Sequence, residues 1–468
     1  MDGVERYSKS GRVVKFVRSV GRNGIRSRPF FESCCKKGVL HTDFTPAGDA
    51  AVRLGEKRVW LYNPVHSKSS ANASALVLKQ SATRSTVSVC LGQSPRNGCE
   101  LICVLALLPF HPSNFFESMP TNQPIIPLEK SQGPYFAGVD IGGTNIKIGL
   151  VDDLGQTLAY DSISTDEHLG PQQAVERCAA TIQKLCEKIQ LPLGQVVRVG
   201  LGSPGTMCLK RGMLLDPPNL PNWHNFAIRD ALQAAAAKPV SFINDANAAS
   251  YGEFWIGTGA KHDSLALLTL GTGVGGGIII DGQLLNGMNS FGSECGHIII
   301  DCRPDARLCV WGGGRGHLEA YASASAVAAR AEEGLRRGAV SSLSRILMNG
   351  KAITSKRVYE AAMIGDEFAL KVVDETAMYL GIGVASIVHA VDPGLVVFGG
   401  AMNFGGTGSP IGERFLERVR AEFKERTFAH VYNGTTIGFA TLGGDAGYLG
   451  AAGTARKDYL QLQTQAVN

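Results

Sequence analysis

The sequence has no apolar run long enough to cross a membrane. Leu101–Phe110 is apolar but only ten residues long, whereas a transmembrane helix needs about 20 residues. This run also lies too far from Met1 to be a secretory signal. We therefore expect no membrane among the partners of this protein.

Closely spaced cysteines and a Walker sequence are missing too. Of the 11 cysteines in the 468 residues, five precede residue 119 and the others are spread along the chain. This excludes a compact disulfide framework and favours reduced thiols and a cytoplasmic location. No GxxxxGK[ST] segment occurs, which excludes a P-loop nucleotide site.

Acidic residues are scarce in the first 118 residues, which hold 17 Lys and Arg against 8 Asp and Glu. The rest of the chain holds 29 against 33, so the net charge of +5 comes entirely from this leader. A mildly acidic body argues against nucleic acid as its main ligand.

Residues 1–133 form a basic, weakly patterned extension. They show no sustained hydrophobic period of 2 or 3.6, so we expect them to be disordered, and residues 1–118 are candidates for absence from the mature protein. A transit peptide, against which Asp2 and Glu5 argue, and a basic nucleic-acid arm are the alternatives.

Glycine and threonine are concentrated in two loops of the body. The first lies in YFAGVDIGGTNIKIGL (135–150) and the second in LTLGTGVGGGIII (268–280), and each joins a strand to a strand. After the second, Asp281-Gly282 predicts a type I′ hairpin turn. Glycine lets backbone N–H groups approach an anion closely. One such loop is compatible with an ordinary hairpin, but two indicate a duplicated, two-lobed α/β fold with a nucleotide's phosphates between the lobes.

Asp245 follows a short buried strand, Val240–Ile243. Ligands of open α/β sheets bind at the carboxyl ends of strands. A partly shielded carboxylate there is suited to act as general base for a hydroxyl that attacks a γ-phosphate. Alternatively, Asn244 and Asp245 cap the next helix, Ala246–Glu253, and the two roles are compatible. Asp140, just before the first loop, is suited to holding Mg²⁺.

Hydrophobic spacing and turn residues predict the other elements of the body. A helix is expected to start at Pro171 and continue to Ile189. Further strands are predicted at Val197–Leu201, Leu395–Phe398 and Thr435–Ala440, and further helices at Phe226–Ala237, Ala320–Arg330, Val358–Gly365, Glu367–His389, Ile411–Phe423 and Asp445–Ala455.

Several segments, in the right order, resemble the ROK family of repressors, open reading frames and kinases. They are VDIGGTNIKIGLVD, GLGSPG, NLPNW, NDANAA with Glu253, LTLGTGVGGG, GSECGH, HLEAYAS and DPGLVVFGGAM, within residues 135–455. The resemblance implies the two-lobed actin/hexokinase-like ATPase fold, which is ribonuclease H-like, with the active site in the interlobe cleft. We expect a small lobe at 134–246, a large lobe at 247–441, and a helix and tail at 442–468 that return to the small lobe.

Proteins of this family are mostly ATP-dependent hexose kinases, glucokinase above all, and the family has a dimeric tendency. The resemblance therefore implies transfer of phosphate from ATP, with Mg²⁺, to the 6-hydroxyl of a hexose, with glucose as the first expectation. It also implies a homodimer. Fructose, mannose, N-acetylmannosamine and N-acetylglucosamine are alternatives, because specificity rests on a few pocket contacts. Some members are sugar-responsive repressors, which need a helix-turn-helix before Tyr135, and the leader shows no such pattern.

The resemblance also implies residue roles. Asp245 is the expected catalytic base. The expected sugar ligands are Gly205, Asn219, Asn244, Glu294, His297 and Glu319. The expected nucleotide-binding residues are Asp140, Gly142, Gly143, Thr144, Lys147, Gly271, Thr272, Gly273, Gly399 and Gly400, the last two on the adenosine side.

The chain departs from the family's zinc motif, CxCGxxGCxE preceded by a His. Cys309 and His297 remain, but Trp311 stands where a Cys is expected, His317 replaces the last Cys, and the segment is one residue longer. Because tetrahedral zinc needs all four ligands, we expect no structural zinc and a loop held by backbone hydrogen bonds. A substitute site with His297, Cys302 or Cys309, and His317 is the alternative.

Overall fold

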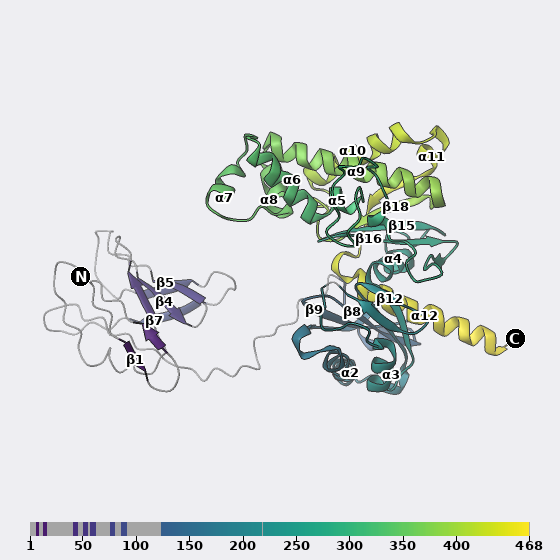
Figure 1. Ribbon diagram of the computed structural model, residues 1–468. Coiled ribbons are helices and arrows are strands. Elements are labelled where there is room, and N and C mark those ends of the chain that lie inside the picture. Colours follow the sequence, from purple (N-terminus) through teal and green to yellow (C-terminus); the bar gives the residue numbers. More distant parts are fainter. Residues whose placement is uncertain are drawn as a thin grey trace, which may run out of the picture. The chain divides into compact units, whose positions relative to one another are not determined.

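The computed structural model describes residues 123–467 except Pro218, and seven short strands before residue 116 (Figure 1). The chain divides into two compact units, Met1–Phe115 and Phe116–Asn468. The strands of the first unit form three small antiparallel sheets, β1–β2, β3–β4–β5 and β6–β7. Their bounds are Arg6–Ser8, Val13–Lys15, His41–Phe44, Ala50–Leu54, Lys57–Leu61, Ala75–Lys79 and Thr86–Cys90.

Most residues of the 1–133 extension lie outside those that the structure describes. The expected disorder, the expected absence from the mature protein and the two alternatives for this segment therefore stay predictions. The apolar run Leu101–Phe110 also falls outside the described residues. Among the described helices, none is both long and apolar enough to span a bilayer.

The small lobe contains a five-stranded sheet in the order β10-β9-β8-β11-β14. Strands β8, β9 and β10 pair antiparallel, whereas β11 and β14 continue from β8 in parallel. The bounds are Tyr135–Ile141, Asn145–Val151, Thr157–Ser164, Val196–Ser203 and Val240–Asn244 for β8, β9, β10, β11 and β14. A small hairpin, β12 (Thr206–Cys208) and β13 (Met213–Asp216), extends from the end of β11.

The large lobe repeats this topology. Its sheet has the order β17-β16-β15-β18-β19, again antiparallel for the first three strands and parallel for the others. The bounds are Leu265–Leu270, Val274–Ile280, Gln283–Leu284, Leu395–Gly399 and Thr436–Phe439 for β15 to β19. The two glycine loops therefore take the same place in the two sheets, between the first and second strand of each. The duplication predicted from the loops is confirmed.

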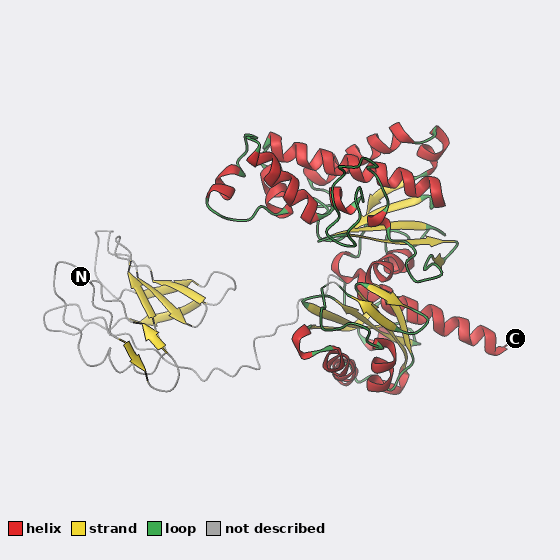
Figure 2. Cartoon of the chain, in the orientation of Figure 1, coloured by secondary structure: helices red, strands yellow, loops and turns green. Residues whose placement is uncertain are grey.

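Helices cover the outer face of each sheet (Figure 2). In the small lobe, α2 (Pro171–Lys188) and α3 (Ile228–Ala236) form one core with inward residues of β8, β9 and β11. In the large lobe, the corresponding core comes chiefly from α6, α8, α9 and α10. Those helices, with the shorter α5, α7 and α11, have the bounds Glu319–Ala322, Ala324–Arg336, Ser344–Met348, Ser355–Met363, Glu367–Val391, Pro410–Arg426 and Ala429–Gly434 for α5 to α11.

Two helices lie between the sheets, α4 (Asp245–Ile256) and α12 (Ala446–Val467). Helix α4 packs on β15 and β16, and α12 packs on β8 and β11. Glycine makes the second contact possible. An ideal Cβ on Gly138 would lie 1.9 Å from the Tyr448 carbonyl oxygen, and one on Gly200 would lie 1.8 Å from that of Ala451. The α12 backbone therefore rests directly on the small-lobe sheet.

One predicted helix is interrupted. The spacing predicted a continuous helix over Ala320–Arg330, but α5 ends at Ala322 and α6 begins at Ala324. Ser323 between them is extended, and its side chain accepts a hydrogen bond from the N–H of Ala326. A serine hydroxyl competes with the helical backbone in this way. The last helix, predicted to end at Ala455, continues to Val467. The other predicted elements occur within a few residues of their expected bounds, and both residues of the Asp281-Gly282 turn have positive φ.

The close approach of α12 to the sheet predicts that Gly200→Ala destabilises the fold. The added Cβ has no space before the Ala451 carbonyl, so we expect the free energy of unfolding to fall by about 1–3 kcal/mol. Urea denaturation followed by tryptophan fluorescence measures this. Gly194→Ala is the matched control, because no atom lies within 4 Å of its ideal Cβ, and a loss of equal size there would contradict the argument.

Candidate functional site

A cavity of ≈ 260 Å³ lies between the lobes. Its walls come from the carboxyl end of β8, the start of α4, the ends of β15 and β18, and the segment that leads into α12. Five of the predicted site residues line it: Asp140, Gly142, Asp245, Gly399 and Gly400. The structure thus brings together the predicted base, the predicted magnesium ligand and glycines of both lobes.

The two carboxylates of the cavity influence each other. The pKa of Asp140 is raised to about 7, first by burial and then by the Asp245 carboxylate, while Lys147 opposes the shift. Burial also raises the pKa of Asp245, against the hydrogen bond that its Oδ1 accepts from the N–H of Ala246, 2.8 Å away. A base with a raised pKa binds a proton more readily.

Asn244 caps α4, as one of the two sequence interpretations had it. Its Oδ1 accepts hydrogen bonds from the N–H groups of Ala246 and Asn247. The cap keeps Asp245 in the first helical turn, at the carboxyl end of β14. Capping and catalysis are compatible here, because the cap uses the Asn244 oxygen and leaves its Nδ2 to face a ligand.

A second group of side chains adjoins Asp245. The pKa of Glu294 is raised, chiefly by partial burial and then by the carboxylates of Asp245 and Glu319, while His297 lowers it. These four predicted residues therefore lie within electrostatic reach of one another. Glu319 is buried, and both its oxygens accept hydrogen bonds, Oε2 from the N–H of Val274 at 2.9 Å and Oε1 from the Cys309 thiol at 3.2 Å.

The second glycine loop contacts this group directly. An ideal Cβ on Gly273 would lie 2.3 Å from Oε2 of Glu319, so a side chain at this position would displace the Glu319 carboxylate. The loop is also tied to the start of α6, since the Gly271 carbonyl accepts from the N–H of Ala324 and the Thr272 carbonyl from the Ser325 hydroxyl. Neither Gly271, Thr272 nor Gly273 is among the residues that line the cavity.

The first glycine loop adjoins the NLPNW segment. An ideal Cβ on Gly143 would lie 3.2 Å from the Cβ of Asn219. The segment is held from below, because Trp223 is fully buried and the N–H of Asn222 donates to Glu167 Oε1 at 2.7 Å. Asn219 itself is exposed beside the loop.

The other predicted residues of the first lobe lie around these loops. The Thr144 carbonyl accepts from the N–H of Thr165, and Gly205 has φ +90 at the turn after β11. The Lys147 ammonium donates to the carbonyl of Gly444, a residue that lines the cavity. None of these three residues lines the cavity itself.

The sequence interpretation missed one wall of the cavity. Ala440, Gly443, Gly444 and Gly447 line it, together with Thr269. The signal was a glycine pair, Gly443-Gly444, immediately before a predicted helix start. The backbone N–H groups of glycines at the start of a helix often contact anions.

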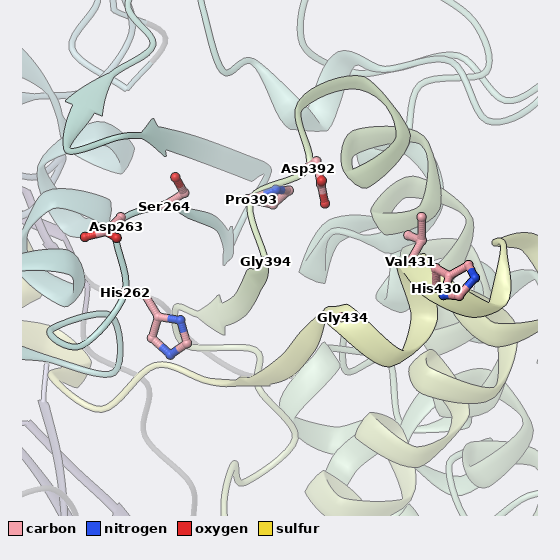
Figure 3. Close-up of a pocket in the computed structure, with 9 residues that line it drawn as sticks. All are labelled: His262, Asp263, Ser264, Asp392, Pro393, Gly394, His430, Val431 and Gly434. Atoms are coloured by element: carbon pink, nitrogen blue, oxygen red, sulfur yellow. The ribbon is translucent and has the colours of Figure 1, made fainter.

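A larger cavity of ≈ 470 Å³ lies elsewhere in the large lobe (Figure 3). His262, Asp263 and Ser264 line it before β15, and Asp392, Pro393 and Gly394 line it before β18. These are the amino-terminal ends of the strands, whereas ligands of such sheets bind at the carboxyl ends. None of the predicted site residues lines this cavity. The smaller cavity between the lobes is therefore the candidate active site.

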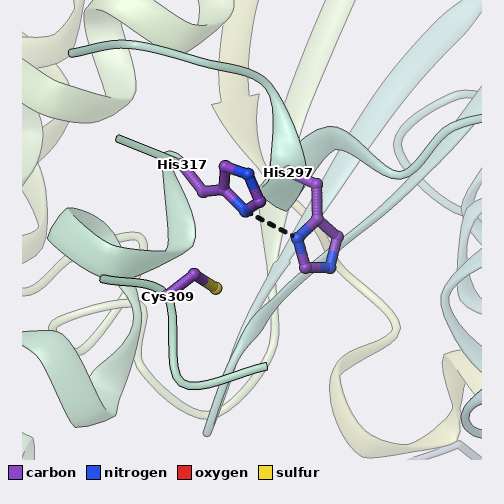
Figure 4. Close-up of side chains that lie close together, drawn as sticks. All are labelled: His297, Cys309 and His317. Atoms are coloured by element: carbon purple, nitrogen blue, oxygen red, sulfur yellow. Dashed lines mark hydrogen bonds between the residues drawn. The ribbon is translucent and has the colours of Figure 1, made fainter. Parts of the chain in front are cut away.

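His297, Cys309 and His317 lie close together, with ligand atoms within 4.8 Å of one another (Figure 4). The two Nδ1 atoms are 3.0 Å apart, and the tautomers of the two rings decide which of them donates the hydrogen bond. Burial, followed by the contact with Glu319, raises the pKa of the Cys309 thiol to about 12. Cys302 is exposed and is not in this group.

Among the described residues, this cluster has too few ligands for a structural zinc site. Such a site takes four protein ligands, and the cluster offers three. The loop has other support: the N–H groups of Cys309, Gly316 and Leu318 donate to the carbonyls of Gly314, Arg307 and Ile298. Backbone hydrogen bonds thus connect the two sides of the loop that carries His297 and Glu319.

Fold and site together define a class of protein, the two-lobed ATPases of the actin/hexokinase-like fold. The model of the ROK family matches residues 136–458 of this chain. The chain belongs to the ROK family.

Two similar proteins are glucokinases. The chain is 34% identical to the glucokinase of Thermotoga maritima, with 67% of this chain and 95% of that protein covered. It is 32% identical to a ROK family glucokinase from Streptomyces griseus solved in complex with glucose and AMPPNP, with a TM-score of 0.56 and 69% of this chain and 99% of that chain covered. A xylose repressor of Caldicellulosiruptor bescii is 32% identical, with 63% of this chain and 72% of that protein covered.

The pKa of Asp140 predicts a pH-dependent effect of Asp140→Asn on stability. Between the ordinary value and about 7 the unfolded chain ionises this group and the native protein does not, so wild-type stability falls as the pH rises through that window. Without nucleotide or Mg²⁺, the variant should exceed the wild type by about 1–4 kcal/mol at pH 8. At pH 4 we expect little difference, and equal unfolding free energies at both pH values would contradict the prediction.

The cluster of His297, Cys309 and His317 predicts a protein without stoichiometric zinc. Elemental analysis of purified protein should find well below one zinc per chain, and prolonged dialysis against a chelator should leave the melting temperature unchanged. One tightly held zinc per chain would show that the three donors recruit a fourth ligand.

Proposed function

We propose that this protein transfers the γ-phosphate of ATP to the 6-hydroxyl of a hexose, with glucose as the preferred sugar. The observation that carries the proposal is the position of Asp245, in a cavity between the lobes whose walls include Gly142, Gly399 and Gly400. Similarity to two glucokinases supports it, one of them solved with glucose and AMPPNP, an analogue of ATP.

In this proposal Asp245 acts as the general base. Its carboxylate takes the proton of the sugar hydroxyl, the sugar oxygen forms a bond to the γ-phosphorus, and the bond from that phosphorus to the leaving ADP oxygen breaks. The raised pKa of Asp245 suits this step, because the carboxylate then holds the proton more strongly. Exclusion of water from the closed cleft limits hydrolysis of ATP.

The sugar is placed against the side chains that adjoin Asp245. Asn244, Glu294, His297 and Glu319 supply donors and acceptors for its hydroxyls, and Asn219 and Gly205 complete the pocket from the small lobe. Carboxylate, amide and imidazole groups in one pocket can bond several hydroxyls at once. Such bonds fix the 6-hydroxyl in reach of the base.

The phosphates are placed at the two glycine loops. Gly142, Gly143 and Thr144 come from the small lobe, and Gly271, Thr272 and Gly273 come from the large lobe. The Lys147 ammonium, which donates to the Gly444 carbonyl, supplies a positive charge near them. Asp140 would hold Mg²⁺, which neutralises phosphate charge when bound. Asp140 fits this role because its pKa is raised in the cavity, and a bound cation would stabilise its ionised form.

The proposal also covers the location, the oligomeric state and the ligands of the protein. We propose a cytoplasmic homodimer whose substrates are ATP and a sugar, without nucleic acid as a ligand. Fructose, mannose, N-acetylmannosamine and N-acetylglucosamine are the competing sugars. The similarity to a xylose repressor makes a sugar-responsive repressor the second candidate function. Its DNA-binding helices would have to lie before residue 123, where the structure describes only short strands.

A coupled assay across these hexoses tests the proposal. We expect the highest kcat/KM with glucose and ATP. Phosphorylation of another hexose with higher kcat/KM would change the assigned substrate. Absence of phosphorylation with every sugar, combined with sugar-dependent DNA binding by the full chain, would favour the repressor.

The base assignment predicts that Asp245→Asn lowers kcat by about 10²- to 10⁴-fold while the protein stays folded. In the wild type, kcat should rise as the pH increases through the raised pKa of Asp245, because only the ionised carboxylate accepts a proton. Asp281→Asn in a hairpin turn is the matched control and should keep normal turnover. Near-normal kcat in Asp245→Asn would refute the assignment.

A further inference from the structure

Glu253 is a fully buried carboxylate in the last turn of α4. Two effects oppose a negative charge at this place. Burial removes it from water, and the carboxyl end of a helix carries a partial negative charge. Neither the proposed base step nor the proposed sugar and phosphate contacts use this residue. Its charge must therefore be stabilised by, and must in turn stabilise, other groups.

Three hydrogen bonds converge on this carboxylate. Oε1 accepts from the N–H of Leu442 at 2.6 Å, and Oε2 accepts from the N–H of Thr258 at 2.9 Å and from the Thr441 hydroxyl at 3.2 Å. Hydrogen bonds to an ionised acceptor are about twice as strong as neutral ones. Space is also tight, since an ideal Cβ on Gly257 would lie 2.2 Å from Oε2. The carboxylate is thus held in one position.

The Thr441–Leu442 donors belong to the turn that joins β19 to α12. This turn is bordered by Ala440 and Gly443, which both line the interlobe cavity together with Asp245. Here the chain leaves the large-lobe sheet and enters the helix that packs on the small-lobe sheet. Glu253 therefore connects the helix that begins at Asp245 to the opposite wall of the same cavity.

Of the two parts that Glu253 connects, the turn has fewer contacts of its own: the Thr258 hydroxyl donates to the Thr441 hydroxyl at 3.2 Å and the Lys147 ammonium donates to the Gly444 carbonyl, while Glu253 alone accepts from the N–H of Leu442. Helix α4 has its own support: Asn244 caps its start, and an ideal Cβ on Gly252 would lie 2.6 Å from the Ala446 carbonyl, so the helix is packed closely against α12. Thr441 and Gly443 are exposed. Loss of the carboxylate should shift the turn and leave Asp245 in place.

We propose that Glu253 is a positioning residue for the nucleotide: it holds the Thr441–Gly444 turn in the place from which this turn contacts ATP. The inference rests on the proposed kinase function. None of the side chains proposed to bind the sugar belongs to the Thr441–Gly444 turn. A change at Glu253 should therefore weaken nucleotide binding and leave sugar binding intact.

The test is Glu253→Gln, which keeps the shape of the side chain but offers one acceptor oxygen and places an NH₂ donor against a backbone N–H. Calorimetry with AMPPNP and with glucose gives the two dissociation constants, and steady-state kinetics gives both KM values. We expect the AMPPNP Kd and the ATP KM to rise about tenfold, which corresponds to one unsatisfied buried donor. The glucose Kd should stay within about twofold.

Two further variants keep the test decisive. Glu422→Gln is the matched control, because Glu422 is also a buried carboxylate, paired with Arg418 and Arg426 and not among the cavity residues. It should lower the melting temperature without changing either Kd. Thr441→Val removes a single donor at an exposed residue. It should raise the AMPPNP Kd by a smaller factor, even if Glu253→Gln fails to fold, and the two effects should be non-additive in the double variant.

Unchanged AMPPNP binding in Glu253→Gln, or equal weakening of both ligands, would overturn the inference, since the second result indicates a purely structural role. If Glu253→Gln does not fold, unchanged AMPPNP binding in Thr441→Val overturns it. Failure of the proposed function is a separate result: the wild-type protein would then phosphorylate no hexose. An active wild type with an equally active Glu253→Gln refutes the role of Glu253 alone.

Discussion

The arrangement of this molecule depends on two half-buried carboxylates, Asp140 and Asp245, that line one cavity. Burial and mutual repulsion raise the pKa of Asp140 to about 7. Helix α12 also reaches the end of β8 closely: an ideal Cβ on Gly447 would lie 2.3 Å from Oδ2 of Asp140. A ligand that brings positive charge to Asp140 would relieve the repulsion, which links the electrostatics of the cleft to binding.

Glycine has a second use on the sugar side. Gly273 leaves room for the Glu319 carboxylate, whose two oxygens also accept from the Val274 N–H and the Cys309 thiol. The glycine loop and the proposed sugar pocket are therefore in direct contact. The loop that carries these side chains has Trp311 where the family has a cysteine, and backbone hydrogen bonds connect its two sides. Movement of the glycine loop would therefore displace the Glu319 carboxylate.

Much of the fold was predictable because its signals are local. Both strand–loop–strand units appear as short alternating runs around glycine, and the structure places them equivalently in two sheets of the same order. Asn244 was a recognisable helix cap. The break at Ser323 was not predicted, since the run Ala320–Arg330 has an uninterrupted helical spacing and the hydroxyl bond to Ala326 depends on the local backbone. Helix α12 continues to Val467, past the predicted end at Ala455.

The candidate site divides in the same way. Local sequence signals were enough for the duplicated fold, the family, and the position of Asp245 at the end of a strand, because each depends on residues that are neighbours in the chain. The packing of distant segments was needed to show that Gly443, Gly444 and Gly447 form a wall of the cavity and that Glu253 bonds to Leu442, 189 residues away. These contacts exist because α12 returns between the two sheets, and the packing of distant segments leaves no period or spacing in a single sequence.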